Sequence, residues 1–280
     1  EDVSITHRTA VIMCADNGVV SEGVSQSDSR VTAQVAKEIA AGRSSVNMLA
    51  NQFSTEILTV DIGIDSDIYC SNIINKKIAY GTRSIVKGPA MDPSQARKAI
   101  SNGIEIVYDL CRNGTDIIIT GEMGIGNTTT SAAIASLILG IPAEITTGRG
   151  AGLDSSGMSR KIAAIHRAIK LNKPDPTDPI DVLSKLGGFD IAGMTGLFLG
   201  GAECGIPIVI DGVISAVSAC LAEMISPGCR DFMLPSHVSN EPSARLLLEK
   251  LGLKAPINAG FHLGEGTGGI MLLPLLDGAL

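Results

Sequence analysis

The fold of this chain follows from one stretch, Ile117-Ile118-Ile119-Thr120-Gly121-Glu122-Met123-Gly124-Ile125-Gly126-Asn127-Thr128-Thr129-Thr130. Its first residues are β-branched and apolar, which is typical of a buried strand, and Ser131 to Leu139 is typical of a helix. The glycines between them let the backbone turn tightly, and the first helical turn offers unpaired N–H groups. A phosphate site needs this order of strand, glycine turn and helix. An ordinary glycine turn of a doubly wound protein, capped by threonine, is the alternative.

Similar apolar runs, each ending in a polar turn with glycine, recur along the chain and predict about six strands. Besides residues 117–120 they are 9–15, 56–60, 143–147, 206–210 and 260–263. Helical patterns lie over 31–51, 92–113, 156–171, 190–203, 215–224 and 241–251. This alternation predicts an α/β fold, a three-layer, doubly wound, mainly parallel and Rossmann-like sheet, with the glycine turns together at the carboxyl edge. We expect residues 70–91 to be irregular and 171–179 to be a surface connection.

Composition narrows the class of protein. The 280 residues, 45% of them hydrophobic, suffice for one domain over residues 1–280, with a smaller helical annex. The net charge of −7 and the 3% of aromatic residues favour neither a nucleic-acid nor a membrane partner. The six cysteines form no CxxC pair, and the chain has neither a long apolar segment nor a signal-peptide pattern. We therefore expect a cytoplasmic enzyme with reduced, mostly buried cysteines, although the first residue is Glu1 rather than Met and an N-terminal segment could be absent.

Two glutamates follow predicted strands and are candidates for acid–base chemistry. Glu265 stands between Gly264 and Gly266, where an apolar wall could raise its pKa so that it accepts a proton. The alternative is a loop glutamate that caps the helix beginning at Thr267. Glu122, inside the central loop, would face a sugar hydroxyl or a ring nitrogen, or else orient another residue.

A second glycine-rich turn covers residues 148–154 and precedes a helix that carries Lys161. Arg149 or Lys161 could neutralise a phosphate bound to this turn. A solvated basic helix face over residues 160–170 is the alternative.

Four more polar residues lie in turns that follow strands. His237, in Pro235-Ser236-His237-Val238-Ser239, is more typical of a structural hydrogen-bonding residue than of a base, because no nucleophile elbow accompanies it. The other three either cap the turn that follows or contact a ligand: Asp16, Asp61 and Asp211.

Five motifs, in order over nearly the whole chain, resemble the nicotinate-nucleotide:dimethylbenzimidazole phosphoribosyltransferase family. They are Gly121-Glu122-Met123-Gly124-Ile125-Gly126-Asn127-Thr128-Thr129, Leu186-Gly187-Gly188-Phe189-Asp190, Ile206-Pro207-Ile208-Val209-Ile210-Asp211-Gly212, Pro235-Ser236-His237 and Leu263-Gly264-Glu265-Gly266-Thr267-Gly268. The N-terminal helices that this family has are missing from the sequence, so the helical annex, which would come from the chain ends, is expected to be incomplete.

The resemblance implies a reaction in which nicotinate mononucleotide and an aromatic base give an α-ribazole phosphate and nicotinate, for cobamide synthesis. Glu265 would be the general base that removes the ring proton of the incoming base, and Glu122 would assist near the ribose. The resemblance also implies that the phosphate binds to Gly124, Gly126, Asn127 and Thr128, and that Gly150, Lys161 and Ser239 complete the nucleotide site. It implies no metal and no cofactor, and a homodimer.

The resemblance places Gln34 and the Ser25-Gln26-Ser27-Asp28 stretch near the incoming base. Where the family usually reads Asp-His-Gly, this chain has Asp16-Asn17-Gly18. The accepted base could therefore be dimethylbenzimidazole, another benzimidazole, a purine or a phenol.

Two other functions remain open from the sequence. A non-catalytic paralogue could keep the fold and pair with an active homologue, although the presence of both Glu122 and Glu265 argues against it. A dinucleotide-dependent oxidoreductase would need a true G-x-G-x-x-G with an acidic residue about 20 positions beyond it, and Glu144 follows a glycine pattern that does not fit.

Overall fold

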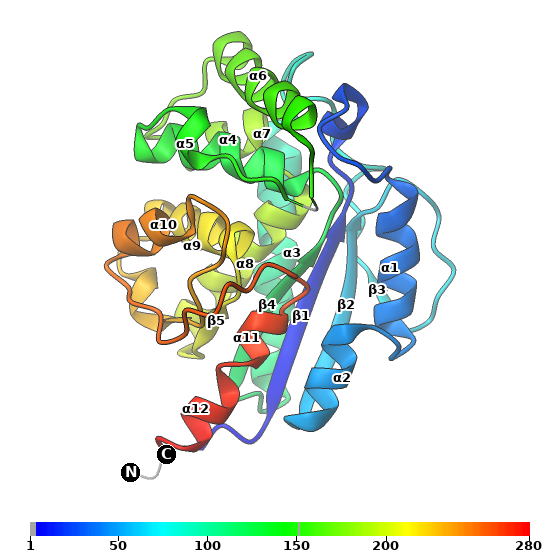
Figure 1. Cartoon of the computed structure of the whole chain (residues 1–280). Coiled ribbons are helices and arrows are strands. Elements are labelled where there is room, and N and C mark those ends of the chain that lie inside the picture. Colours follow the sequence, from blue (N-terminus) through cyan, green and yellow to red (C-terminus); the bar gives the residue numbers. More distant parts are fainter. Residues whose placement is uncertain (1–3, 151) are drawn as a thin grey trace.

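A computed structural model describes residues 4–150 and 152–280, in which six parallel strands form one sheet with helices on both faces (Figure 1). The strand order is β3-β2-β1-β4-β5-β6. The strands are β1 (Arg8–Ala15), β2 (Thr55–Gly63), β3 (Ile73–Asn75), β4 (Ile117–Met123), β5 (Ile208–Ile210) and β6 (Met233–Pro235). The doubly wound α/β prediction is confirmed.

The sheet separates two hydrophobic cores. Successive side chains of β1 point alternately into one core and the other. Val11 and Met13 point into one core, while Ala10, Ile12 and Cys14 point into the other. The first core packs against α3 (Pro93–Arg112), α8 (Phe189–Cys204) and α9 (Val213–Ile225). The second packs against α1 (Arg30–Ala40), α2 (Ser45–Gln52), α11 (Thr267–Ile270) and α12 (Leu273–Asp277).

Glycines let α3 and α8 approach each other closely under the sheet. A Cβ on Gly103 would lie 2.1 Å from the carbonyl oxygen of Gly193, and a Cβ on Gly196 would lie 2.0 Å from that of Ile100. No larger residue fits at Gly103 or Gly196 without moving a helix. This close contact fixes the position of α8 relative to α3. The first turn of α8 carries Asp190.

The remaining helices gather mostly beyond the carboxyl ends of the strands, where α4 to α7 lie together (Figure 1). They are α4 (Asn127–Leu139), α5 (Ala143–Thr146), α6 (Ser155–Asn172) and α7 (Pro179–Leu186), with α10 (Ala244–Leu251) beside α9. Two 3₁₀ turns, η1 (Gly18–Glu22) and η2 (Cys229–Phe232), complete the elements of the described residues. Asp154 caps α6 by accepting from the Gly157 N–H at 2.7 Å.

Several sequence predictions of elements are wrong at their ends or in type. The helix expected over 31–51 divides into α1 and α2, because Gly42 takes a left-handed φ of 76° and Ser44 begins a capping box with Asn47. Residues 143–147, expected as a strand, form α5, since a short apolar run does not distinguish the two. Residues 260–263 form no strand.

The strands that the sequence did not predict are short. One is β6, and the other is β3, which lies within the 70–91 stretch that we expected to be irregular. Three residues are too few to show a period of two. The connection expected over 171–179 is confirmed from Lys173 to Asp178, and it leads to α7, which the sequence reading missed.

All six cysteines are free, as expected, and Cys14, Cys220 and Cys229 are buried while the other three are half-buried. In the described part of the chain, no helix has both the length and the apolar character that crossing a membrane requires. Glu1 and Asp2, and Ala151 of the second glycine-rich turn, lie outside the described residues.

Candidate active site

The turns after β1, β4 and β5 meet at the carboxyl edge of the sheet, beside the point where the strand order changes direction. Asn17 N donates to the carbonyl of Ile125 at 3.3 Å, which joins the turn after β1 to the central loop. Gly266 N donates to Oδ2 of Asp211 at 3.3 Å, which joins the Glu265 turn to the end of β5. The expected convergence of these glycine turns is confirmed, at the place where doubly wound folds bind ligands.

Glu265 lies in a tight turn against β4. Its φ of 60° is a left-handed conformation that residues other than glycine rarely adopt. A Cβ on Gly264 would come within 2.8 Å of Oε1 of Glu122, and a Cβ on Gly121 within 3.0 Å of the Glu265 carbonyl. Burial, and then the charge of Asp211, raises the pKa of the half-buried Glu265 carboxyl. The structure therefore brings the two predicted glutamates to one place.

Asp211 holds the turn that carries Glu265. Its Oδ1 accepts from Gly269 N at 2.8 Å and its Oδ2 from Gly266 N, so that the carboxylate caps the start of α11. Nδ1 of the neighbouring His237 lies 2.9 Å from Oγ of Ser236. Burial lowers the pKa of His237, and the charge of Asp211 opposes that shift. Asp211 therefore caps the turn, and His237 lies within hydrogen-bond distance of Ser236, which is consistent with the structural role that the sequence favoured.

A single amide connects the half-buried Glu122 to the buried carboxyl of Asp190. Nδ2 of Asn127 donates to Oε2 of Glu122 and also to Oδ2 of Asp190, at 3.0 Å. Burial, followed by the charge of Asp190, raises the pKa of Glu122 to about 8. Burial raises the pKa of Asp190 to about 6, although hydrogen bonds from Asn127 and from Ile191 N oppose the shift. Both carboxyls are thus harder to ionise than exposed ones, and the pKa of Glu122 is the higher of the two.

Asn17 belongs to the same cluster. Thr130 Oγ1 donates to Oδ1 of Asn17 at 3.2 Å, and the Asn17 side chain helps to keep the pKa of Asp190 from rising further. A Cβ on Gly188 would lie 2.2 Å from the Asp190 carboxylate and 2.5 Å from Oδ1 of Asn17. Asn17, the residue that departs from the family pattern, thus lies next to Asp190 in the Glu122–Asn127–Asp190 bridge.

Lys161 is fully buried, so the solvated-face alternative is wrong for this residue, whereas Arg160 beside it is exposed. The Lys161 ammonium donates to Thr128 Oγ1 at 2.9 Å and to the carbonyl of Gly148 at 3.0 Å. Burial lowers the pKa of Lys161 to about 8, and the charge of Glu241 opposes that shift. A cation held under a glycine turn can bind an anion.

The backbone of Gly150 completes this arrangement. Its φ is 53°, and a Cβ there would lie 2.9 Å from Thr128 Oγ1 and 3.5 Å from the Lys161 ammonium. Gly150 N donates to Oε1 of Glu241 at 3.1 Å. We call Gly148, Gly150, Thr128 and Lys161 the anion cradle. It adjoins the carboxylate cluster, because Thr128 follows Asn127 in the first turn of α4.

The other predicted site residues make fewer contacts with the two glutamates or with the anion cradle. Ser239 is buried, and its Oγ lies 4.0 Å from where a Cβ of Gly212 would be, at the end of β5. Gly124 and Gly126 lie in the central loop, with a Cβ on Gly124 only 2.6 Å from Oδ2 of Asp190. Gln34 is exposed on α1 and makes no side-chain hydrogen bond within the described residues.

Asp16 and Asp61 both cap turns. Oδ2 of Asp16 accepts from Asp65 N at 2.8 Å, and Oδ1 of Asp61 accepts from Ile64 N at 3.0 Å. Asp61 also forms an ion pair with Lys77 at 2.9 Å. Both aspartates lie at strand ends as expected, and their bonds stabilise the edge of the site.

Two residues were given no role from the sequence. Asp190 was part of a quoted motif, and its place after two glycines at a helix start was a usable signal. Glu241 lies in a polar loop whose sequence shows no feature that separates it from other surface glutamates. Only its contact with Gly150 identifies it.

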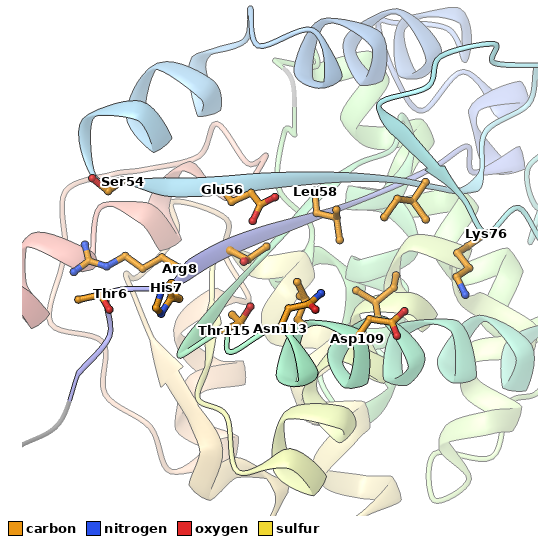
Figure 2. Close-up of a pocket in the computed structure, with 14 residues that line it drawn as sticks. Thr6, His7, Arg8, Ser54, Glu56, Leu58, Lys76, Asp109, Asn113 and Thr115 are labelled. Carbon is orange, nitrogen blue, oxygen red and sulfur yellow. The ribbon is translucent and has the colours of Figure 1, made fainter. Parts of the chain in front are cut away.

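A separate cavity of about 420 Å³ opens at the opposite, amino end of the strands (Figure 2). Side chains from the starts of β1 and β2 face the last turns of α3 there, including His7, Glu56 and Asp109. None of the predicted site residues lines it. It is therefore distinct from the candidate active site.

Comparisons with known proteins agree with the motifs. The sequence model of the phosphoribosyltransferase family matches residues 1–280. The chain is 47% identical over 276 residues to the nicotinate-nucleotide–dimethylbenzimidazole phosphoribosyltransferase of Ruminiclostridium cellulolyticum, covering 99% of this chain and 78% of that protein. It is 46% identical over 277 residues to the protein of the same name from Clostridium acetobutylicum, covering 99% and 79%.

Among solved structures, CobT from Thermus thermophilus superposes with a TM-score of 0.94 at 35% identity, over 99% of this chain and 83% of that one. Sequence and fold thus agree over nearly all of the chain. The chain belongs to the nicotinate-nucleotide:dimethylbenzimidazole phosphoribosyltransferase family, a family of enzymes.

Proposed function

We propose that this enzyme transfers the phosphoribosyl group of nicotinate mononucleotide to an aromatic base in cobamide synthesis. One observation carries the proposal: consecutive residues of α4 serve two different sites. Asn127 donates to the Glu122 and Asp190 carboxylates, and Thr128 accepts from Lys161 in the anion cradle. A ribose phosphate has its reacting carbon and its phosphate at opposite ends, and this pair of sites suits such a molecule.

In the proposed reaction the bond between C1′ and the nicotinate nitrogen breaks, and a bond between C1′ and the incoming base forms on the opposite face. Nicotinate leaves with the bonding electron pair, which neutralises its ring nitrogen. Glu265 takes the proton that the incoming ring loses, and its raised pKa makes it a stronger base than an ordinary glutamate. Displacement at an anomeric carbon demands chiefly positioning and stabilisation of positive charge.

The roles of the neighbouring groups follow from their protonation. Glu122, with a pKa of about 8, can donate a hydrogen bond to the ribose or to the base. Asp190 supplies the negative charge that stabilises a cationic transition state without touching the substrate. The phosphate binds at the anion cradle, with Gly124, Gly126 and Ser239 as further contacts.

The base pocket lies on the side of Asn17, Gln34 and the 25–28 stretch. We propose dimethylbenzimidazole as the first substrate to test, with other benzimidazoles, purines and phenols as the alternatives that the polar character of this side supports. Residues 1–280 act as one domain with a small helical part from the chain ends. The active form is a cytoplasmic dimer of this chain, or a pair with a paralogue.

A silent subunit is the competing proposal, and Asn17 in place of the usual histidine is the observation that favours it. Protection of the isolated chain against heat by nicotinate mononucleotide, without turnover, would identify such a subunit.

The test incubates the purified chain with nicotinate mononucleotide and a panel of benzimidazoles, purines and phenols. We expect nicotinate release that depends on one class of base and that falls at least about a hundredfold in Glu265→Gln. An exposed control, Glu249→Gln, should keep the wild-type rate. Binding of the nucleotide without release for any base would favour the silent subunit.

A further inference from the structure

Glu241 places a carboxylate where the proposed function requires a phosphate. Its Oε1 accepts from Gly150 N at 3.1 Å, and its Oε2 lies 2.1 Å from where a Cβ of Gly148 would be. The carboxylate is thus seated directly on the backbone of the glycine turn. Only a residue without a side chain at position 148 allows this contact.

The charge of Glu241 acts on the cation of the same cradle. Among the described residues, Glu241 is the charged group that opposes the loss of the proton from buried Lys161. The ammonium donates its hydrogen bonds to Thr128 Oγ1 and the Gly148 carbonyl, and it makes no direct ion pair with this carboxylate within 4.0 Å. Glu241 therefore provides an anion at the cradle without neutralising Lys161 by contact.

Backbone hydrogen bonds hold the loop on both sides of Glu241, whose side chain is half-buried. Asn240 N donates to the carbonyl of Phe261 at 2.9 Å, and Ala244 N donates to the carbonyl of Glu241 at 3.1 Å. These bonds fix the backbone and do not involve the half-buried Glu241 side chain. A movement of the carboxylate away from Gly150 N would break neither of these backbone bonds.

We propose that Glu241 is a displaceable internal anion: it occupies the anion cradle in the free enzyme and gives way to the phosphate of the substrate. The inference rests on the proposed function for the identity of that substrate. A carboxylate and a phosphate dianion accept the same Gly150 N–H and attract the same ammonium, so they exclude each other at this place. Glu241 keeps the glycine turn ordered before binding and weakens every anion that binds there, so it is a positioning residue rather than a catalytic one.

Glu241→Gln tests this directly, because it keeps the shape and an acceptor for Gly150 N but removes the charge. Inorganic phosphate serves as the probe in calorimetric titrations at pH 7, since its binding does not depend on turnover. We expect the variant to bind phosphate at least about threefold more tightly than wild type, because a competing charge has been removed. The matched control is Glu249→Gln, an exposed glutamate of α10, and its phosphate affinity should stay within about twofold of wild type.

Turnover gives the second readout. In Glu241→Gln the KM for nicotinate mononucleotide should fall by a similar factor while kcat stays within about twofold, since only the competition at the phosphate changes. A variant that binds phosphate equally or more weakly, or phosphate that binds to neither form at millimolar concentration, overturns the inference. Phosphate binding as expected without any turnover of nicotinate mononucleotide would instead refute the proposed function and leave the role of Glu241 intact.

A measurement on the wild-type protein covers the case in which the variant does not fold. A crystal structure with inorganic phosphate should show a phosphate oxygen at Gly150 N and the Glu241 carboxylate turned away. Phosphate bound elsewhere, with Glu241 still on Gly150 N, contradicts the proposal.

Discussion

Nδ2 of Asn127 lies 3.0 Å from Oδ2 of Asp190 and gives its other hydrogen to Glu122. One neutral amide thus joins the half-buried carboxyl of Glu122 to the buried carboxyl of Asp190, with no cation among their hydrogen-bond partners in the described part of the chain. Burial and the neighbouring negative charge both oppose the ionisation of a second carboxyl here, so we expect one of the two to keep its proton to a higher pH. The raised pKa of Glu122 identifies it as the one that does.

Removing the bridge should destabilise the protein in a way that depends on pH. Asn127→Ala leaves the half-buried Glu122 and the buried Asp190 without a shared donor, and we expect the free energy of unfolding to fall by about 2–4 kcal/mol. The loss should be larger at pH 9 than at pH 6, because Glu122 is ionised only at the higher pH. Urea denaturation at both pH values measures it, with the exposed Asn51→Ala as control. An equal loss at both pH values would show that the carboxylates do not interact through the amide.

The pH dependence of stability should report Glu122 itself. Its pKa in the folded state, about 8, lies above the unfolded value of about 4.3, so the folded state binds the extra proton. The contribution of Glu122 to stability is fully present below about pH 4 and is lost as the pH rises toward 8.

Glu122→Gln removes this titration. Between pH 5 and pH 8, wild type should lose on the order of 1–3 kcal/mol of stability relative to the variant. Parallel denaturation series in matched buffers give the difference, and Glu56→Gln, at an exposed position of β2, should follow the wild-type curve. Parallel curves for wild type and Glu122→Gln would mean that Glu122 is ionised in the folded protein throughout.

Lys161 should affect substrate affinity more than the chemical step. Lys161→Met removes the buried ammonium, and we expect the KM for nicotinate mononucleotide to rise at least about tenfold with a smaller change in kcat. The wild-type KM should also rise above pH 8, since an ammonium with a pKa of about 8 loses its charge there. The exposed neighbour, in Arg160→Met, is the control. A fall in kcat at unchanged KM would place Lys161 in the chemical step instead.

The packing of α3 on α8 should tolerate no side chain at Gly103. In Gly103→Ala the new Cβ would lie 2.1 Å from the Gly193 carbonyl oxygen, so the helices must separate, and the free energy of unfolding should fall by about 2–4 kcal/mol. Arg97→Ala, exposed on the same helix, should change it by less than about 0.5 kcal/mol. Thermal and urea denaturation compare the two variants, and similar stabilities would disprove the tight contact.

Local signals were sufficient where an element is long or bears a glycine at its end. The periodicity over 92–113 predicted α3 within one residue at each end, because its burial repeats with the helical period over many turns. The three-residue strands β3 and β6 and the four-residue helix α5 are too short for such a period, so the sequence assigned them wrongly or not at all. The order of the strands in the sheet lies beyond any local signal.

By itself the sequence determined the fold class, the convergence of glycine turns and the choice of Glu122 and Glu265 as candidates. Each of these depends on residues that are neighbours in the chain. Tertiary structure alone decided the raised pKa of Glu122, through burial and then the charge of Asp190, and the contact of Glu241 with Gly150 N in the anion cradle. Those effects depend on burial and on distances between residues far apart in the sequence. The free energy of ionising a side chain depends on whether water or buried protein surrounds it, and the sequence does not show which.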